Sequence, residues 1–152
     1  AEPGREEEII IRLARVGYDH AIGFLEGGIA AWVKEGYSLD TIPTVTVEEF
    51  AAAHASGSMS ILDVRKASEF NSEHIIGAVN APLDYIDESM SLINKNQTYY
   101  VHCAGGYRSM VFISILKSRG FNNLIDVNGG FAAIKRSGEF QITDYVCPTT
   151  LL

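Results

Sequence analysis

The sequence predicts an α/β fold in which helices cover both faces of a parallel sheet. Three short segments, 60–64, 99–102 and 123–126, are rich in the apolar, β-branched and aromatic residues typical of buried strands. Helical patterns lie between these segments and after them. Strands that alternate with helices form parallel sheets, because each parallel connection needs a crossover that a helix supplies.

The elements follow in order from Thr46. The segment Thr46-Val47-Glu48-Glu49 is a capping box and predicts a helix through Ala53, which Gly57 ends. The other expected elements are a strand at 60–64, a helical turn at 66–70, a strand at 78–80 stopped by Pro82, a helix at 84–93, a strand at 99–102, a helix at 109–119, a strand at 123–126, and a helix at 129–137 stopped by Gly138.

The most informative stretch is 99–120, which predicts a strand, a tight loop and a helix. Gly105 and Gly106 allow the backbone to fold back on itself, and Ser109 is expected to be the N-cap of the helix. Cys103 therefore lies at the carboxyl end of a strand and before a helix N-terminus. Free N–H groups and the helix dipole favour an anion at such a position.

Cys103 is the candidate nucleophile. A free cysteine has a pKa near 8.5 and is only about 3% thiolate at pH 7. We expect the loop amides, the helix N-terminus and Arg108 to favour the thiolate. Arg108 lies five positions after the cysteine, and its planar guanidinium is suited to bridging two oxygens of a bound anion. The alternatives are an inert buried cysteine and a solvated arginine at a helix start.

Other residues are expected to support this site. Asp63 and Arg65 follow a strand that should end at the same edge of the sheet, where ligands of parallel sheets bind. Asp63 would accept hydrogen bonds from the loop or an arginine, and Arg65 would add positive charge; the alternative is a surface ion pair. Tyr107 would either form a pocket wall or be exposed. His102 is expected to be packed rather than to act as a base.

Composition restricts the possible functions. The chain has 152 residues, 47% of them apolar, and a net charge of −7, which disfavours nucleic acid and anionic membranes as partners. Two cysteines far apart in sequence predict a reducing, cytoplasmic location, with Cys147 a bystander. The histidines lack metal-ligand spacing, so no metal is predicted. Without a start methionine or leader, the chain is expected to be a fragment or a processed form.

An internal repeat changes the expected domain organisation. Residues 13–18 match residues 116–121 at an offset of 103, and residues 25–32 match residues 127–134 at an offset of 102. At the first offset, Ala1 falls on Ala104, and the position that matches Cys103 would lie before residue 1.

We therefore predict that residues 1–40 are the C-terminal half of a first domain, 41–45 a linker, 46–141 a complete domain and 142–152 a C-terminal tail. The half-copy should pack on the complete domain or on another chain to cover its apolar residues, which include Ile10, Leu13, Ile22, Phe24 and Trp32.

Three motifs resemble the rhodanese (sulfurtransferase) family. The segment Cys103-Ala104-Gly105-Gly106-Tyr107-Arg108-Ser109 is similar to its active-site loop, with six residues from cysteine to arginine. The stretch from Leu62 to Leu83, with Asp63, Arg65 and Glu69, resembles the first family motif, and Asn128 to Gly138 resembles the second. The likeness covers 46–138, and residues 1–36 resemble the rear half of another such domain.

The resemblance implies a rhodanese-like sheet and transfer of a sulfane sulfur from thiosulfate or a persulfide to a thiol or cyanide. Cys103 would carry the sulfur as a persulfide, residues 104–109 would bind the substrate, and no cofactor would be needed. A phosphatase or arsenate reductase is less favoured, because related phosphatases have one more residue in the loop. The acidic loop 1–7 predicts that the first domain is non-catalytic.

The alternative is a non-catalytic sulfur-relay or regulatory module. The paired arrangement resembles fusions of a metallo-β-lactamase-like hydrolase with rhodanese-like domains, so a fused or associated hydrolase of that kind is a possible partner.

Overall fold

The computed structural model describes residues 2–15, 17–57 and 59–147, and the chain divides into two units, Ala1–Thr41 and Ile42–Leu152. The predicted features at Ala1, at Val16 of the repeat and at 148–152 of the tail lie outside the described residues.

A five-stranded sheet forms the centre of the second unit, and its three long strands are those expected from the sequence. All pairings are parallel, in the order β1-β5-β4-β2-β3. The strands are β1 (Thr44–Val45), β2 (Ser60–Asp63), β3 (Val79–Asn80), β4 (Tyr99–His102) and β5 (Leu124–Val127). Asp63 is in register with His102, so β2 and β4 end together at one edge.

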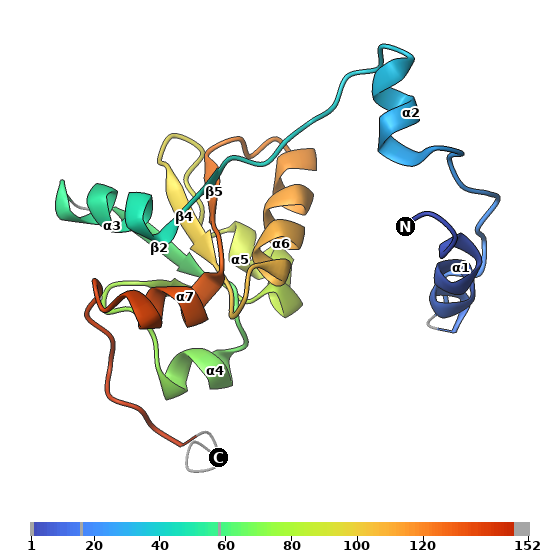
Figure 1. Cartoon of the computed structure of the whole chain (residues 1–152). Helices are drawn as coiled ribbons and strands as arrows, with labels where there is room; N and C mark the ends of the chain where they lie inside the picture. The colour runs from blue at the N-terminus through green and yellow to red at the C-terminus, as the bar shows by residue number, and fades with distance from the viewer. Residues whose placement is uncertain (1, 16, 58, 148–152) are drawn as a thin grey trace. The chain divides into compact units, whose positions relative to one another are not determined.

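Helices cover both faces of this sheet, which confirms the predicted fold class. The helices are α3 (Val47–Ala55), α4 (Ala67–Ser72), the 3-10 turn η1 (Leu83–Tyr85), α5 (Ile86–Met90), α6 (Tyr107–Ser118) and α7 (Gly130–Ser137). Figure 1 shows α5 and α6 on one side of the strands and α3 and α7 on the other.

Alternation along the strands supplies two separate cores. On β2, Leu62 packs with Phe112 of α6, whereas the neighbouring Ile61 packs on the other face with Phe50 of α3 and Ile134 of α7. Successive strand residues point to opposite faces, so a parallel sheet with two covered faces needs apolar residues at both positions.

Several sequence-based expectations differ from the structure in detail, among them the helix expected at 84–93, which is η1 followed by α5. The expected N-cap at Ser109 is wrong: α6 begins at Tyr107, and its N-cap is Gly106, whose φ is 105°. The expected linker contains β1, which pairs with β5. The tail is tied to the domain, because Ser72 and Val146 exchange hydrogen bonds of 2.6 and 2.8 Å.

The first unit shares helices and a glycine-pair conformation with the matched segments. Its helices are α1 (Glu6–Ala14) and α2 (Gly28–Lys34), and no strand is present among its described residues. The φ angles of Gly27 and Gly28 are 74° and 57°, and those of the matching Gly129 and Gly130 are 78° and 56°. The two glycine pairs therefore share a local conformation, and the assignment of a half-domain stays a prediction.

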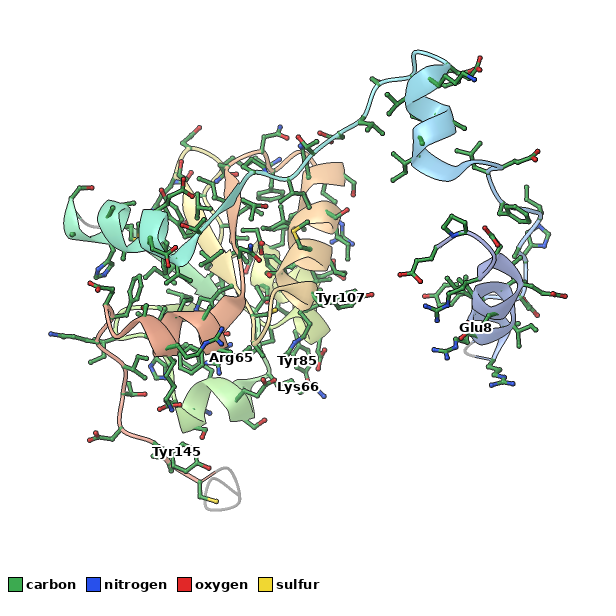
Figure 2. All side chains as sticks on the ribbon, viewed as in Figure 1. Glu8, Arg65, Lys66, Tyr85, Tyr107 and Tyr145 are labelled. Atoms are coloured by element: carbon green, nitrogen blue, oxygen red, sulfur yellow. The ribbon has the colours of Figure 1, made fainter. Side chains whose placement is uncertain are left out.

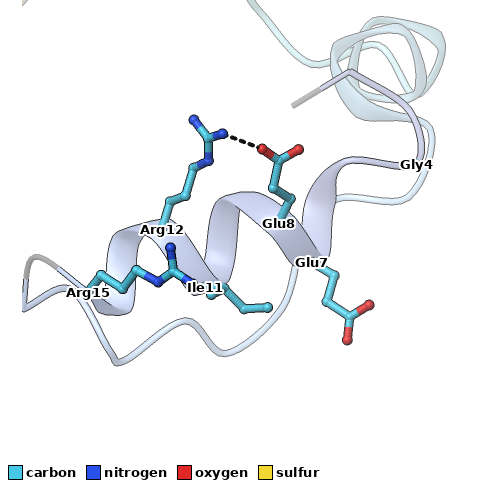
Figure 3. Close-up of a pocket in the computed structure, with 6 residues that line it drawn as sticks. All are labelled: Gly4, Glu7, Glu8, Ile11, Arg12 and Arg15. Carbon is cyan, nitrogen blue, oxygen red and sulfur yellow. Dashed lines mark ion pairs between the residues drawn. The ribbon is translucent and has the colours of Figure 1, made fainter.

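Apolar side chains of the first unit are exposed. Its helices contain no buried residue, and Ile22, Phe24 and Trp32 are 93%, 64% and 40% exposed. A hollow over α1 is lined by Gly4, Glu7, Glu8, Ile11, Arg12 and Arg15 (Figure 3). Arg12 there pairs with Glu8 at 2.7 Å, as on an ordinary solvated helix face. The expectation that these apolar residues pack on the complete domain or on another chain stays a prediction.

Candidate active site

Cys103 directly follows β4 at the carboxyl edge of the sheet, as the sequence predicted. Residues 104–106 then turn the chain into α6. Gly106 makes this turn with a φ of 105°, a backbone conformation that residues other than glycine rarely adopt. The neighbouring strand is fastened at the same edge, because the amide of Val64 donates to the carbonyl of His102 at 3.0 Å.

The loop directs its hydrogen-bond donors at the sulfur. The Gly106 amide lies 3.1 Å from the Cys103 Sγ, and the Ser109 hydroxyl lies 3.6 Å away. Burial raises the pKa of the thiol, but hydrogen bonds from the Ser109 amide and hydroxyl and from the Gly106 and Gly105 amides outweigh it. The net pKa of Cys103 is therefore lowered, which favours the nucleophilic thiolate.

The N-terminus of α7 holds the loop in this orientation. The Phe131 amide donates to the Cys103 carbonyl at 2.7 Å, and the Ala132 amide donates to the Ala104 carbonyl at 3.1 Å. Because the peptide group is planar, fixing these carbonyls also fixes the direction of the amides that follow them. A Cβ on Gly130 would lie 2.5 Å from the Cys103 carbonyl oxygen, so only glycine permits this approach.

The sulfur lies at the bottom of the loop. Cys103 is 1% exposed, whereas Tyr107 beside it is 82% exposed and Gly105 is also exposed. Of the two alternatives for Tyr107, a pocket wall or an exposed side chain, the structure shows the exposed one. A molecule that reacts with the sulfur must therefore approach it with a narrow end.

Arg108 is held by a carboxylate that the sequence did not single out as a site residue. Its two terminal nitrogens lie 2.6 and 3.0 Å from the two carboxylate oxygens of Glu69 in α4. These hydrogen bonds raise the pKa of Arg108 and lower that of Glu69, and both side chains are partly exposed. The guanidinium is thus beside the loop, but its charge is already compensated.

Asp63 and Arg65 form a buried ion pair rather than a surface pair. The Arg65 Nη2 lies 2.6 Å from Asp63, and the side chains are 6% and 0% exposed. Arg65 also donates to the Glu73 carbonyl at 2.8 Å and lies 4.0 Å from the Phe131 ring centroid. Asp63 accepts from Arg65, not from the loop, so the pair braces the ends of β2 and α7.

Two buried polar groups lie beneath the loop. His102 is fully buried. Burial lowers its pKa, and the negative charge of Asp63, which raises it, only partly offsets this effect. Its Nδ1 lies 3.4 Å from the Cys103 carbonyl, as expected for a packed histidine. Asp126 on β5 is 3% exposed; burial raises its pKa, although a hydrogen bond with Ser109 opposes this. An acid inside an apolar strand was the available sequence signal for Asp126.

The described residues contain no cluster of three or more His, Cys, Asp or Glu side chains that could hold a metal ion. Within the same residues, no helix has the length and apolar character needed to cross a membrane.

Sequence comparisons place residues 46–137 in the Rhodanese-like domain family. The putative sulfur carrier protein YrkF of Bacillus subtilis is 33% identical over 91 residues, covering 59% of this chain and 49% of YrkF. The uncharacterized protein YqhL of the same organism is 31% identical over 103 residues, covering 68% of this chain and 78% of YqhL. The thiosulfate sulfurtransferase GlpE of Tolumonas auensis is 28% identical over 87 residues, covering 57% of this chain and 82% of GlpE.

Solved structures agree with the fold. The solution structure of the rhodanese-like domain from the Anabaena protein Alr3790 has a TM-score of 0.61 at 29% identity, covering 68% of this chain and 80% of that chain. A crystal structure of Alr3790 has a TM-score of 0.59 at 28% identity, covering 70% of this chain and 97% of that chain. A rhodanese-like domain protein from Staphylococcus aureus has a TM-score of 0.58 at 31% identity, covering 61% of this chain and 91% of that protein.

Proposed function

The chain belongs to the rhodanese-like domain family, and we propose from this premise that its second unit is a sulfurtransferase that works through a Cys103 persulfide. The observation that carries the proposal is the set of donors around one sulfur atom: amides of Gly105, Gly106 and Ser109 and the Ser109 hydroxyl. Such a ring stabilises a small sulfur anion without a metal or an organic cofactor.

The first step is attack by the Cys103 thiolate on the outer sulfur of a donor, thiosulfate or a persulfide. A bond forms between Sγ and that sulfur, and the bond from that sulfur to the rest of the donor breaks. The leaving group, sulfite or a thiolate, takes the electron pair, and Cys103 is left as an anionic persulfide. The loop amides that lower the thiol pKa would then hold this anion.

In the second step a thiol or cyanide attacks the outer sulfur and releases the Cys103 thiolate. The protein alternates between two covalent states, so the kinetics should be of the double-displacement type. Because Cys103 is only 1% exposed, the proposal requires a second nucleophile that is small or narrow.

Mass spectrometry of the intact chain tests the proposal. After incubation with thiosulfate and with benzenethiosulfonate, the wild type should gain the mass of one sulfur atom, which cyanide then removes. Cys103→Ser should show neither gain nor turnover, and its circular dichroism should stay that of the wild type.

Cys147→Ser is the matched control, because it removes the other, exposed cysteine. It should keep both the mass gain and the turnover. Persulfide formation that persists in Cys103→Ser, or that disappears in Cys147→Ser, would show that the nucleophile is misassigned.

The alternative function is a sulfur-relay or regulatory module for a metallo-β-lactamase-like hydrolase. That partner, like the cytoplasmic location, stays a prediction. An intact cysteine and arginine in the loop favour catalysis over a purely regulatory role.

A further inference from the structure

The pairing of Arg108 with Glu69 determines what charge the loop presents to a donor. The two residues are 39 positions apart, and α4 and α6 bring them together in a bidentate contact of 2.6 and 3.0 Å. Their side chains are 28% and 35% exposed, so the pair is partly shielded from water. A bidentate pair of this kind is stronger and more directional than an ordinary surface pair.

The cations that follow β2 are compensated in the same way. Arg65 is bound by the buried carboxylate of Asp63 at 2.6 Å, and the exposed Lys66 lies 3.6 Å from Asp84. Each of these cations therefore has a carboxylate partner, and the whole chain carries a net charge of −7. The described surroundings of the loop do not provide the excess positive charge that would attract a dianion.

The rim of the loop suits an organic donor. Tyr107 of α6 and Tyr85 of η1 are 82% and 63% exposed, and α6 packs against η1. Figure 2 shows both tyrosines in the region of Lys66, beside the first turn of α6. Exposed aromatic rings beside the loop fit a donor whose organic body rests on them while its terminal sulfur approaches Cys103.

We propose that Glu69 is a specificity-determining positioning residue, which, by binding Arg108, makes the loop select organic donors with one negative charge on the sulfane group over the inorganic dianion thiosulfate. This inference rests on the proposed sulfur transfer. The selected class comprises persulfide and thiosulfonate anions. With a thiosulfonate, the outer sulfur moves to Cys103, a sulfinate monoanion leaves with the electron pair, and the total charge is unchanged.

The test compares two donors that differ by one charge, thiosulfate and benzenethiosulfonate, with cyanide as the acceptor. The measured quantity is the ratio of their kcat/KM values on the same protein sample, so that any loss of folded protein cancels. Wild type should favour benzenethiosulfonate. Glu69→Gln, which keeps an oxygen for the Lys66 amide, should shift the ratio about tenfold toward thiosulfate, because the freed guanidinium then attracts the second charge.

Asp87→Asn is the matched control. It also removes one carboxylate from an arginine pair, that of Arg119 at 2.5 Å, but Arg119 lies at the opposite end of α6 from the loop. Its ratio should stay at the wild-type value. In an Arg108→Gln background, Glu69→Gln should no longer change the ratio.

The outcomes separate the two proposals. If wild type transfers sulfur but Glu69→Gln leaves the ratio unchanged, or shifts it no more than Asp87→Asn does, the role of Glu69 is refuted and the sulfurtransferase proposal stands. A shift that persists in Arg108→Gln would show that Glu69 does not act through Arg108. If wild type forms no persulfide with either donor, the proposed function itself fails.

Discussion

Substitution of Gly130 by alanine should test how the loop is held. Gly130 has a φ of 56°, and an added Cβ would lie 2.5 Å from the Cys103 carbonyl oxygen and 2.8 Å from the Ala104 carbonyl carbon. Both atoms belong to the backbone, so neither can swing aside as a flexible side chain does. The start of α7 and the loop must therefore move apart.

The expected cost follows from two contributions. Placing alanine in the left-handed region costs about 1–2 kcal/mol. Moving α7 away weakens the hydrogen bonds from Phe131 to Cys103 and from Ala132 to Ala104, each with a net value of about 1 kcal/mol. The free energy of unfolding should fall by about 3 kcal/mol, which a domain of ordinary stability survives. Because the loop amides lose their fixed direction, persulfide formation should also slow.

Gly138→Ala is the matched control, since Gly138 ends the same helix with a φ of 72° and has nothing within 4 Å of the added Cβ. It should show only the conformational cost of about 1–2 kcal/mol and keep the wild-type rate of persulfide formation. Urea unfolding and the mass-gain assay measure both quantities. Equal destabilisation by the two substitutions, with equal rates, would refute the close-approach argument.

Two further predictions concern the thiol. Ser109→Ala removes a hydroxyl that lowers the pKa of Cys103, so the pH midpoint for alkylation of Cys103 by iodoacetamide should rise; Ser118→Ala, at the other end of α6, should leave it unchanged. Since the folded pKa of Cys103 is lowered, the thiolate stabilises the fold most above the unfolded pKa of the thiol, and this contribution is lost as pH falls through the folded value. The urea midpoint of wild type should therefore rise relative to that of Cys103→Ser as pH increases from about 6 to 9. A relative fall would contradict the lowered pKa.

The fold could be predicted because its determinants are local. Apolar runs mark β2, β4 and β5, and the capping box at Thr46 forms as expected, with hydrogen bonds of 2.8 and 3.2 Å to Glu49. The place of Cys103 follows from the same logic, since a cysteine at the end of a central parallel strand must lie at the carboxyl edge. Local patterns are sufficient wherever neighbours in sequence determine the structure.

The electrostatics of the site could not be predicted in this way. Sequence spacing indicates that Arg108 begins a helix, but not that α4 places Glu69 against it. The helix start was misassigned for a related reason. Serine is a frequent N-cap residue, but Gly106 adopts a positive φ and begins the helix earlier. The Ser109 hydroxyl then lies 3.1 Å from the Gly106 carbonyl and 3.6 Å from the sulfur.

Glycine can be required for two reasons, a positive φ or the lack of space for a side chain, and the matched glycines at 28 and 130 distinguish them. Gly28 and Gly130 have nearly the same φ, 57° and 56°, so both copies need glycine for conformation. Only Gly130 also needs it for space, because the backbone of Cys103 approaches it, whereas no described atom lies within 4 Å of a Cβ on Gly28. The local sequence thus determines the conformation of the glycine pair. Whether the pair also holds a loop depends on the backbone that packs against it. In the second unit that loop carries the cysteine, so the same two glycines become part of the proposed sulfur site.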